Sequence, residues 1–258
     1  MVSPVHKNSI WSFHPSDIIV ALTLLTRLPL GNFLQADFDR QASATWAFPI
    51  AGLAVSSIAA IIAFVTLSMG FNAALVAGLT LISLIITTGG LHEDGLADTV
   101  DGFWGGHSIE SRLEIMSDST IGTYGILALI STIGLRWISL TLLLPVSILP
   151  LLAVAALSRA GMSAMMAWVP LAKKSGISAA IGAPPVASVA TAACIALTVG
   201  WLILGAAILP VALIAILVFS SIAILTQQKI CGQTGDVLGA AQQVCETVCL
   251  VFIAFSLA

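Results

Sequence analysis

Charged side chains are scarce in this sequence of 258 residues, which has nine Lys or Arg and twelve Asp or Glu. They make up 8% of the chain, against about 25% in a soluble domain. So few charges cannot cover a soluble fold of this length, and they also exclude a disordered chain and a basic nucleic-acid binder. With 59% hydrophobic residues and a mean hydropathy of +1.09, the composition predicts a polytopic protein in the lipid bilayer.

The sequence also lacks paired cysteines and strands in which polar and apolar residues alternate. The four cysteines form no C-x-x-C pair, and three of them lie in or beside apolar stretches, so we interpret them as small buried hydrophobes. The apolar runs are longer than the alternating strands of about 10 residues in a membrane β-barrel. No repeat or long linker divides the chain. We therefore expect one all-α, membrane-embedded domain over residues 1–258.

Seven apolar runs are long enough, or nearly so, to cross about 30 Å of hydrocarbon. They are approximately residues 48–71, 72–90, 121–143, 148–169, 186–206, 211–226 and 237–258. The apolar stretch from Asp17 to Pro29 is too short to span and predicts an interfacial or half-inserted helix. The expected fold is thus a polytopic integral membrane protein with about seven transmembrane helices and a short N-terminal helix.

The loop cations give an orientation for these spans. With seven spans, all of them fall on one side of the membrane: Lys7, Arg27, Arg40, Arg112, Lys173, Lys174 and Lys229. The positive-inside rule makes that side cytoplasmic. We expect the N-terminus and the loop 91–120 to face the cytoplasm, the C-terminus to lie outside, and the protein to reside in the cytoplasmic (inner) membrane.

Acidic residues concentrate in one segment. Seven of the twelve lie between positions 93 and 118: Glu93, Asp94, Asp98, Asp101, Glu110, Glu114 and Asp118. Asp94, Asp98 and Asp101 are spaced i, i+4, i+7, which places them within about 60° on one helix face. Three like charges on one face are explained by Mg²⁺, which takes carboxylate oxygens and shares its shell with substrate phosphates. His92 fits a metal ligand, a phosphate donor or a structural histidine equally well.

Polar residues at two predicted helix starts have two interpretations each. Asp118 or Ser119 can cap the helix that begins near Ile121, and such a helix terminus is also an anion site. Tyr124, the only tyrosine, is either a site residue or an interfacial anchor. Asp236 enters the last helix from a glycine-rich turn, as an N-cap or as a further metal-binding or basic carboxylate.

Arginine inside a predicted span is the other break in the apolar pattern. Ser158 and Arg159 lie about ten residues into the fourth span, where a charge costs on the order of 3 kcal/mol. The guanidinium suits phosphate binding, and the alternative is a structural ion pair with Glu246. Arg136 is nearer the outer end of its helix, where it could snorkel to the interface.

Several of these segments together resemble the cobalamin synthase family, the adenosylcobinamide-GDP ribazoletransferases. The most diagnostic is GGLHEDGLADTVDGFWGG (89–106). It is accompanied, in the order of the family, by LTRLPL (25–30), FPIAGL (48–53), RLEIMSDSTIGTYG (112–125), LSRAGM (157–162) and TGDVLGA (234–240). The match covers almost the whole chain. One departure is Cys231, which stands where glycine is usual before Gly232.

The resemblance implies the last assembly step of the cobalamin nucleotide loop, carried out in the membrane with Mg²⁺. A ribose hydroxyl of α-ribazole, or of its 5′-phosphate, would attack a phosphorus of adenosylcobinamide-GDP and release GMP. The acidic pattern of the family falls on His92, Asp94, Gly95, Asp98, Asp101 and Gly102, and the later motifs on Arg112, Asp118, Gly122, Thr123, Tyr124, Ser158, Arg159, Thr234, Gly235 and Asp236.

Chemistry and resemblance together assign roles. Asp94, Asp98 and Asp101 would hold Mg²⁺ on the diphosphate, and one of them or Asp118 would act as the base. We expect substrate contacts from Arg27, His92, Arg112, Thr123, Tyr124, Ser158, Arg159, Thr234 and Asp236. The sequence leaves open which carboxylate is the base, whether nucleoside or 5′-phosphate is preferred, where the corrinoid binds, and whether the protein forms a homo-oligomer.

Rival functions fit the residues less well. CDP-alcohol phosphotransferases share spaced aspartates, but their D-G-x-x-A-R pattern is broken here, because Asp98 follows Ala97. Prenyltransferases carry paired aspartate-rich clusters, and this sequence matches them only in part, at Glu93 and Asp94. A transporter would carry acids at mid-membrane in several spans, and only Glu246 lies well inside one.

Overall fold

The computed structural model describes residues 13–30 and 38–257, so Lys7 lies outside the described residues. The described residues form helices and a single isolated bridge between Leu171 and Gln233, with no strand. The all-α prediction is therefore confirmed. The helices are α1 (Ser16–Leu25), η1 (Phe38–Arg40), α2 (Gln41–Ala44), η2 (Thr45–Ala47), α3 (Phe48–Ser68), α4 (Ala73–Thr88), α5 (Leu91–Gly105), α6 (Ile109–Ile115), α7 (Thr123–Leu143), α8 (Pro150–Trp168), α9 (Ile177–Ile181), α10 (Val186–Leu204), η3 (Gly205–Ala207), α11 (Ile208–Ile230) and α12 (Gly235–Leu257).

Each of the seven predicted spans carries one long helix, namely α3, α4, α7, α8, α10, α11 and α12. Within the described ranges, five helical stretches are long and apolar enough to cross a membrane, and one of them, Val186–Ile230, contains both α10 and α11. The pair α4 and α5, bent by 86°, would make a sixth. We count only α4 of this pair as spanning, because α5 carries four acidic residues. The short apolar helix α1 is present as predicted.

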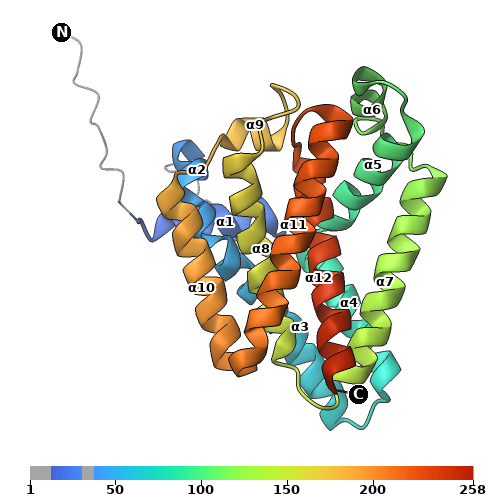
Figure 1. Ribbon diagram of the computed structural model, residues 1–258. Helices are drawn as coiled ribbons and strands as arrows, with labels where there is room; N and C mark the ends of the chain where they lie inside the picture. The colour runs from blue at the N-terminus through green and yellow to red at the C-terminus, as the bar shows by residue number, and fades with distance from the viewer. Residues whose placement is uncertain (1–12, 31–37, 258) are drawn as a thin grey trace.

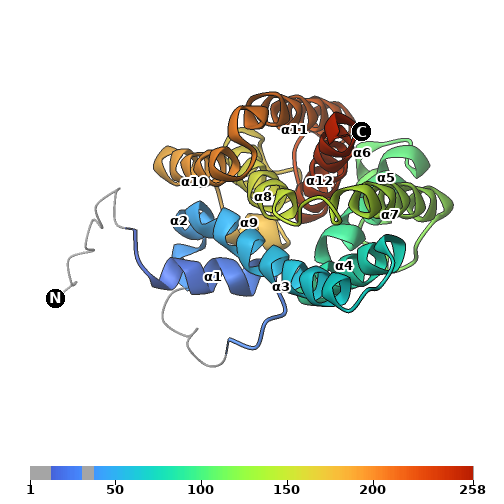
Figure 2. The ribbon, with the colours of Figure 1, turned by 90° about the horizontal axis from the view of Figure 1, so that it is seen from below.

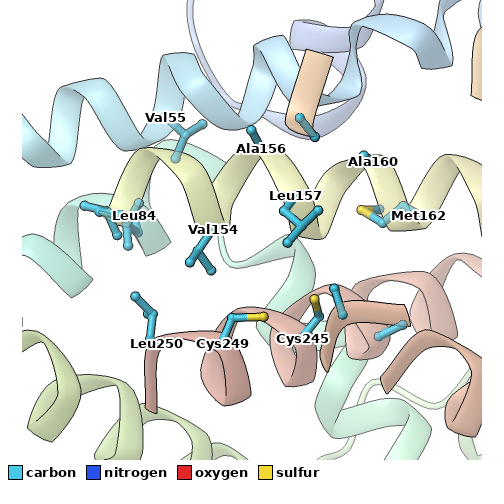
Figure 3. Close-up of a cluster of buried hydrophobic side chains, with 14 of the residues drawn as sticks. Val55, Leu84, Val154, Ala156, Leu157, Ala160, Met162, Cys245, Cys249 and Leu250 are labelled. Carbon is cyan, nitrogen blue, oxygen red and sulfur yellow. The ribbon is translucent and has the colours of Figure 1, made fainter. Parts of the chain in front are cut away.

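Helices α8 and α12 occupy the interior of the bundle. In their most apolar windows, 72% of α8 and 78% of α12 is buried, against 22% of α7. Viewed along the bundle, α3, α4, α7, α10 and α11 surround this central pair (Figure 2). Figure 3 shows α8 between α3, which contributes Val55, and α12, which contributes Cys245 and Leu250. Polar residues on α8 and α12 are therefore shielded from lipid by the outer helices.

The interval 91–120 is not the loop that hydropathy suggests. Residues 91–105 form α5 and residues 109–115 form α6. The corner between α4 and α5 is made by Gly89 and Gly90, whose φ values are 68° and 71°, a left-handed region that glycine enters without strain. α5, α6 and α9 lie at the end of the bundle opposite the C-terminus (Figure 1). The acids are thus presented from a helix at one end of the bundle.

The cysteines are all free, and only some are buried. Cys245 and Cys249 belong to the apolar core, as predicted, whereas Cys194 and Cys231 are exposed. Cys231 ends α11 with φ +58°, and no other non-glycine residue of the described chain has a positive φ. The glycine-like conformation of this turn is therefore kept although the residue is cysteine.

Candidate active site

The acidic face of α5 is built against the start of α12. A Cβ at Gly95 would come within 2.7 Å of the backbone oxygen of Asp236, so the absence of a side chain there lets the two helices meet. Asp94 is exposed and Asp98 is half-buried. No described residue donates a hydrogen bond to either carboxylate. Both carboxylates are therefore free to take an external ligand.

Asp98 is half-buried and surrounded by three other acids. Burial raises the pKa of Asp98 to about 7, together with the charges of Asp94, Asp236 and Asp101. The ammonium of Lys173 acts in the opposite direction. Asp94, Asp236 and Asp101 are thus close enough to Asp98 to disfavour its ionised form, which a bound cation would relieve.

Asp101 has a different environment from the other two aspartates of the predicted triad. Its Oδ2 accepts a hydrogen bond from the backbone N–H of Gly122 at 2.7 Å, and its Oδ1 accepts one from Gly125 at 2.9 Å. Asp101 therefore caps the N-terminus of α7, where a carboxylate also favours the helix dipole. The expected cap, Asp118 or Ser119, is wrong because α7 begins at Thr123.

The second half of the acidic segment lies on the surface. Asp118 is exposed and accepts a hydrogen bond from the N–H of Thr120 at 3.0 Å. This hydrogen bond lowers the pKa of Asp118. Thr123 and Tyr124 are exposed on the first turn of α7. Thr123 and Tyr124 lie on the turn of α7 that Asp101 caps, whereas Ser117, next to Asp118, accepts a hydrogen bond from Lys173 at 3.2 Å. The roles of these three predicted site residues stay predictions.

A cavity of about 270 Å³ opens beside Asp94. Asp236 of α12 and Lys173 of the loop after α8 also line it. From the sequence, Lys173 indicates only the orientation of the spans in the membrane. Nothing in the sequence distinguishes it from Lys174, because its approach to the acids depends on how the loop folds back. The loop is held there by Gln233, which bonds to the backbones of Pro170 and Ala172.

His92 also lines this cavity, and its side chain has no partner. Its exposed fraction is 1%, and neither Nδ1 nor Nε2 has a hydrogen bond within the described structure. Burial lowers the pKa of His92, with a contribution from the charges of Arg159 and Arg136. A buried imidazole without a partner is costly, which indicates that a ligand or water completes it.

The predicted intramembrane arginine is part of an ion-pair cluster. Arg136 of α7 lies 2.6 Å from Glu246 of α12 and 3.3 Å from Glu93 of α5. Arg159 of α8 lies 3.5 Å from Glu246. The ion pair with Glu246, one of the two readings of Arg159, is therefore present, and its contact with phosphate stays a prediction. The expectation that Arg136 snorkels is wrong, since it is 1% exposed.

Two glutamines and a serine complete this buried cluster. Gln243 accepts a hydrogen bond from Arg136 at 2.7 Å and donates one to Glu93 at 3.0 Å. Gln242 donates to the hydroxyl of Ser158 at 3.1 Å. Ser158 therefore faces protein rather than an open site. The sequence signal for these contacts is the pair of glutamines at positions 242 and 243, which are polar residues inside the last predicted span.

The remaining predicted residues have local partners. Arg112 donates to the backbone oxygens of Gly106 at 3.1 Å and Lys229 at 2.9 Å, so it joins the end of α5 to the end of α11. Arg27 is exposed and packs beside Gly89 at the α4–α5 corner. Thr234 donates to Asp236 at 3.2 Å and accepts from the N–H of Val237 at 3.3 Å. Thr234, rather than Asp236, therefore caps α12.

Among residues 13–30 and 38–257, the structure has no group of three His, Cys, Asp or Glu side chains that could together hold a metal ion. Mg²⁺ does not need such a cage, because it is usually bound through one or two carboxylates together with substrate phosphates and water. Asp94 and Asp98 supply two carboxylates without hydrogen-bond donors, and Asp101 keeps free lone pairs. The donor set therefore fits Mg²⁺ bound jointly with a phosphorylated substrate.

Comparison with known proteins places the chain in a family. The profile of the cobalamin-5-phosphate synthase family matches residues 17–254. The chain is 43% identical over 246 residues to an adenosylcobinamide-GDP ribazoletransferase of Bradyrhizobium diazoefficiens, and 39% identical to one of Mesorhizobium japonicum, with 93% of each chain covered in both cases. No solved structure matches it. On the extent of these matches, the chain belongs to the cobalamin-5-phosphate synthase family.

Proposed function

We propose that this protein is an adenosylcobinamide-GDP ribazoletransferase that works at the membrane surface with Mg²⁺. The observation that carries the proposal is family membership over residues 17–254, together with an acidic helix whose carboxylates Asp94 and Asp98 have no donors. In the reaction, a ribose hydroxyl oxygen of α-ribazole, or of its 5′-phosphate, forms a bond to the phosphorus that carries the cobinamide. The bond from this phosphorus to GMP breaks, GMP leaves with the electron pair, and adenosylcobalamin or its 5′-phosphate forms.

The carboxylates of α5 would position the diphosphate. Mg²⁺, when bound, neutralises charge on the phosphate oxygens and on the departing GMP. Asp94 and Asp98 would hold it, with Asp101 as a third candidate that also fixes α7. Lys173 adds a positive charge at the same cavity, which suits the developing charge on the phosphate oxygens.

A carboxylate near the ribose hydroxyl must take its proton. Asp236 is the residue that we favour, because it lines the cavity beside Asp94 and Thr234 holds one of its oxygens by a hydrogen bond of 3.2 Å. Asp118 is less suited, since it is fully exposed and does not line the cavity. A general base must lie within hydrogen-bond reach of the proton that it removes.

We also propose that the protein lies in the cytoplasmic (inner) membrane with the acidic end of the bundle in the cytoplasm. The cations Arg112, Lys173 and Lys229 support this orientation through the positive-inside rule. A site at this surface lets water-soluble nucleotides meet a bulky amphipathic corrinoid without crossing hydrocarbon.

The test is product formation by protein purified in detergent. GMP release from adenosylcobinamide-GDP should require both α-ribazole and Mg²⁺. Asp94→Asn and Asp98→Asn should each lower kcat by at least about 100-fold, because each removes a carboxylate that would hold Mg²⁺ on the diphosphate. Glu110→Gln and Glu114→Gln, on the exposed helix α6, are the controls and should keep wild-type activity.

Two results would contradict the proposal. GMP release that proceeds without α-ribazole would indicate a hydrolase, and near-normal activity of both aspartate variants would remove the metal assignment. A CDP-alcohol phosphotransferase is not favoured, because the family match and the broken D-G-x-x-A-R pattern both oppose it.

A further inference from the structure

The cavity beside Asp94 has two chemically distinct halves. Its opening carries Asp94, Asp236 and Lys173. Its inner wall is mostly apolar and includes Phe48 of α3 and the methionines Met162 and Met166 of α8. Two buried polar side chains also line it, His92 and Ser178, and the hydroxyl of Ser178 already donates to Gln233. Phe48 and the two methionines are at most 5% exposed, and Met162 is drawn on α8 in Figure 3. A ligand that fills this cavity therefore needs a polar end and an apolar end.

Size limits which substrate can fill the cavity. A volume of about 270 Å³ lies just below the usual range for small-molecule pockets, about 300–1,000 Å³. A corrinoid macrocycle with its side chains is much too large. A single nucleoside is of suitable size, and the proposed reaction has two nucleoside units, the guanosine of GDP and α-ribazole.

The hydrogen-bonding groups of the inner wall distinguish these two nucleosides. His92 is a buried polar side chain there without a hydrogen-bond partner, and its imidazole offers an N–H donor. The base of α-ribazole is a dimethylbenzimidazole, which has one ring nitrogen as an acceptor and is otherwise apolar. Guanine has several donors and acceptors on its edge. An apolar wall would leave most of them without partners, at a cost of about 1–3 kcal/mol each.

We infer that this cavity is the binding site for α-ribazole, with the base against Met162, Met166 and Phe48 and the ribose at the carboxylates. Sulfur and aromatic rings contact favourably. The ring nitrogen of the base accepts a hydrogen bond from His92, and the ribose hydroxyl faces Asp94 and Asp236. This inference rests on the proposed function, which names the two substrates but not where either one binds.

Two neighbouring methionines give a matched test. Met165 and Met166 are 4% and 3% exposed on the same helix, but Met165 lines a separate apolar hollow between α8, α10 and α11. Met166→Ala should raise the KM for α-ribazole about 10-fold or more, because it removes apolar contact with the base. The KM for adenosylcobinamide-GDP should change less than about twofold. Met165→Ala should change neither constant.

A binding measurement keeps this inference separate from the proposed function. Calorimetry with α-ribazole on the purified, folded protein needs no turnover, and Met166→Ala should weaken binding about 10-fold while Met165→Ala leaves it unchanged. GMP serves as the second probe, and its affinity should be the same for both variants. The inference is overturned if Met166→Ala weakens GMP instead, or if the two variants behave alike. Failure of wild-type turnover with intact α-ribazole binding would contradict only the proposed reaction.

Discussion

The carboxylate of Asp101 on α5 accepts the backbone N–H of Gly122 at a distance of 2.7 Å, and so joins the acidic helix to the start of α7. Gly125 donates to its second oxygen. One side chain of the predicted metal triad thus holds together two helices that are separated in the sequence by α6. We therefore expect substitution of Asp101 to lower the stability of the protein. Substitution of Asp94 or Asp98 should lower its activity instead.

We expect Asp101→Ala to destabilise the protein by about 2–3 kcal/mol, because hydrogen bonds to a charged group contribute about 1.5–3 kcal/mol. Thermal unfolding in detergent should show a Tm lower by several degrees. Asp94→Ala is the control, since Asp94 is exposed and has no donor, and its Tm should match the wild type. Equal Tm values for the two variants would contradict the capping role of Asp101.

The buried arginine of α7 gives a second prediction. Arg136→Met should cost about 3–5 kcal/mol, because Glu93 and Glu246 would share a single remaining cation, Arg159. The double variant Arg136→Met, Glu93→Leu removes one complete ion pair and leaves the pair of Arg159 with Glu246. It should recover much of the lost Tm, and a double variant less stable than the single one would contradict this account.

Activity is expected to depend on pH through Asp98. Its pKa, raised to about 7 by burial and by the charges of Asp94, Asp236 and Asp101, means that the proton competes with Mg²⁺ below neutrality. The ionised form predominates only above pH 7, so the Mg²⁺ concentration for half-maximal activity should rise about tenfold per pH unit below it. Assays between pH 6 and 8 measure this. A constant Mg²⁺ requirement over this range would argue against Asp98 as a ligand.

Lysine variants provide an internal check on that titration. Lys173 opposes the rise in the pKa of Asp98, so Lys173→Gln should move the pH midpoint upward. Lys174 is exposed and does not line the cavity, and Lys174→Gln should leave the midpoint in place. The same shift in both variants would indicate a general surface-charge effect.

A substitution in the turn before α12 is expected to stabilise the protein. Cys231 has φ +58°, and a left-handed conformation costs a residue with a Cβ about 1–2 kcal/mol. Cys231→Gly should therefore raise the stability by roughly 1 kcal/mol, measured as an increased Tm. Cys194→Gly, in the middle of α10, should instead lower it by about 0.5–1 kcal/mol. A decrease in both would show that glycine is unfavourable at position 231 as well.

The long helices could be predicted because each needs only a local signal, a run of apolar residues of sufficient length. Hydropathy alone does not indicate α5, because its acids lower the hydropathy, whereas the spacing of Asp94, Asp98 and Asp101 does indicate one helix face. The contacts of Arg136 and Asp101 join helices far apart in the chain. Their partners follow from how the helices pack, which one sequence does not display.

The residues of the candidate site also differ in whether a local sequence signal indicates them. The acids were found because carboxylates are rare in this chain, so their clustering is conspicuous. Lys173 and the methionines at 162 and 166 carry no such signal, since a loop lysine and an apolar residue in a span are ordinary. Their relation to the acids appears only when α8, α12 and the loop after α8 enclose the cavity.

The buried cluster of Arg136, Arg159, Glu93 and Glu246 has zero net charge, which matters in an energised membrane. An electrical potential of 100 mV acts on one elementary charge with about 2.3 kcal/mol across the full bilayer. Because two cations balance two anions, a potential across the bilayer should exert almost no net force on this cluster. We therefore expect the packing of α5 against α7, α8 and α12 to be independent of voltage. A variant that loses one of the four would become a small voltage sensor, with a conformation that depends on the energetic state of the cell.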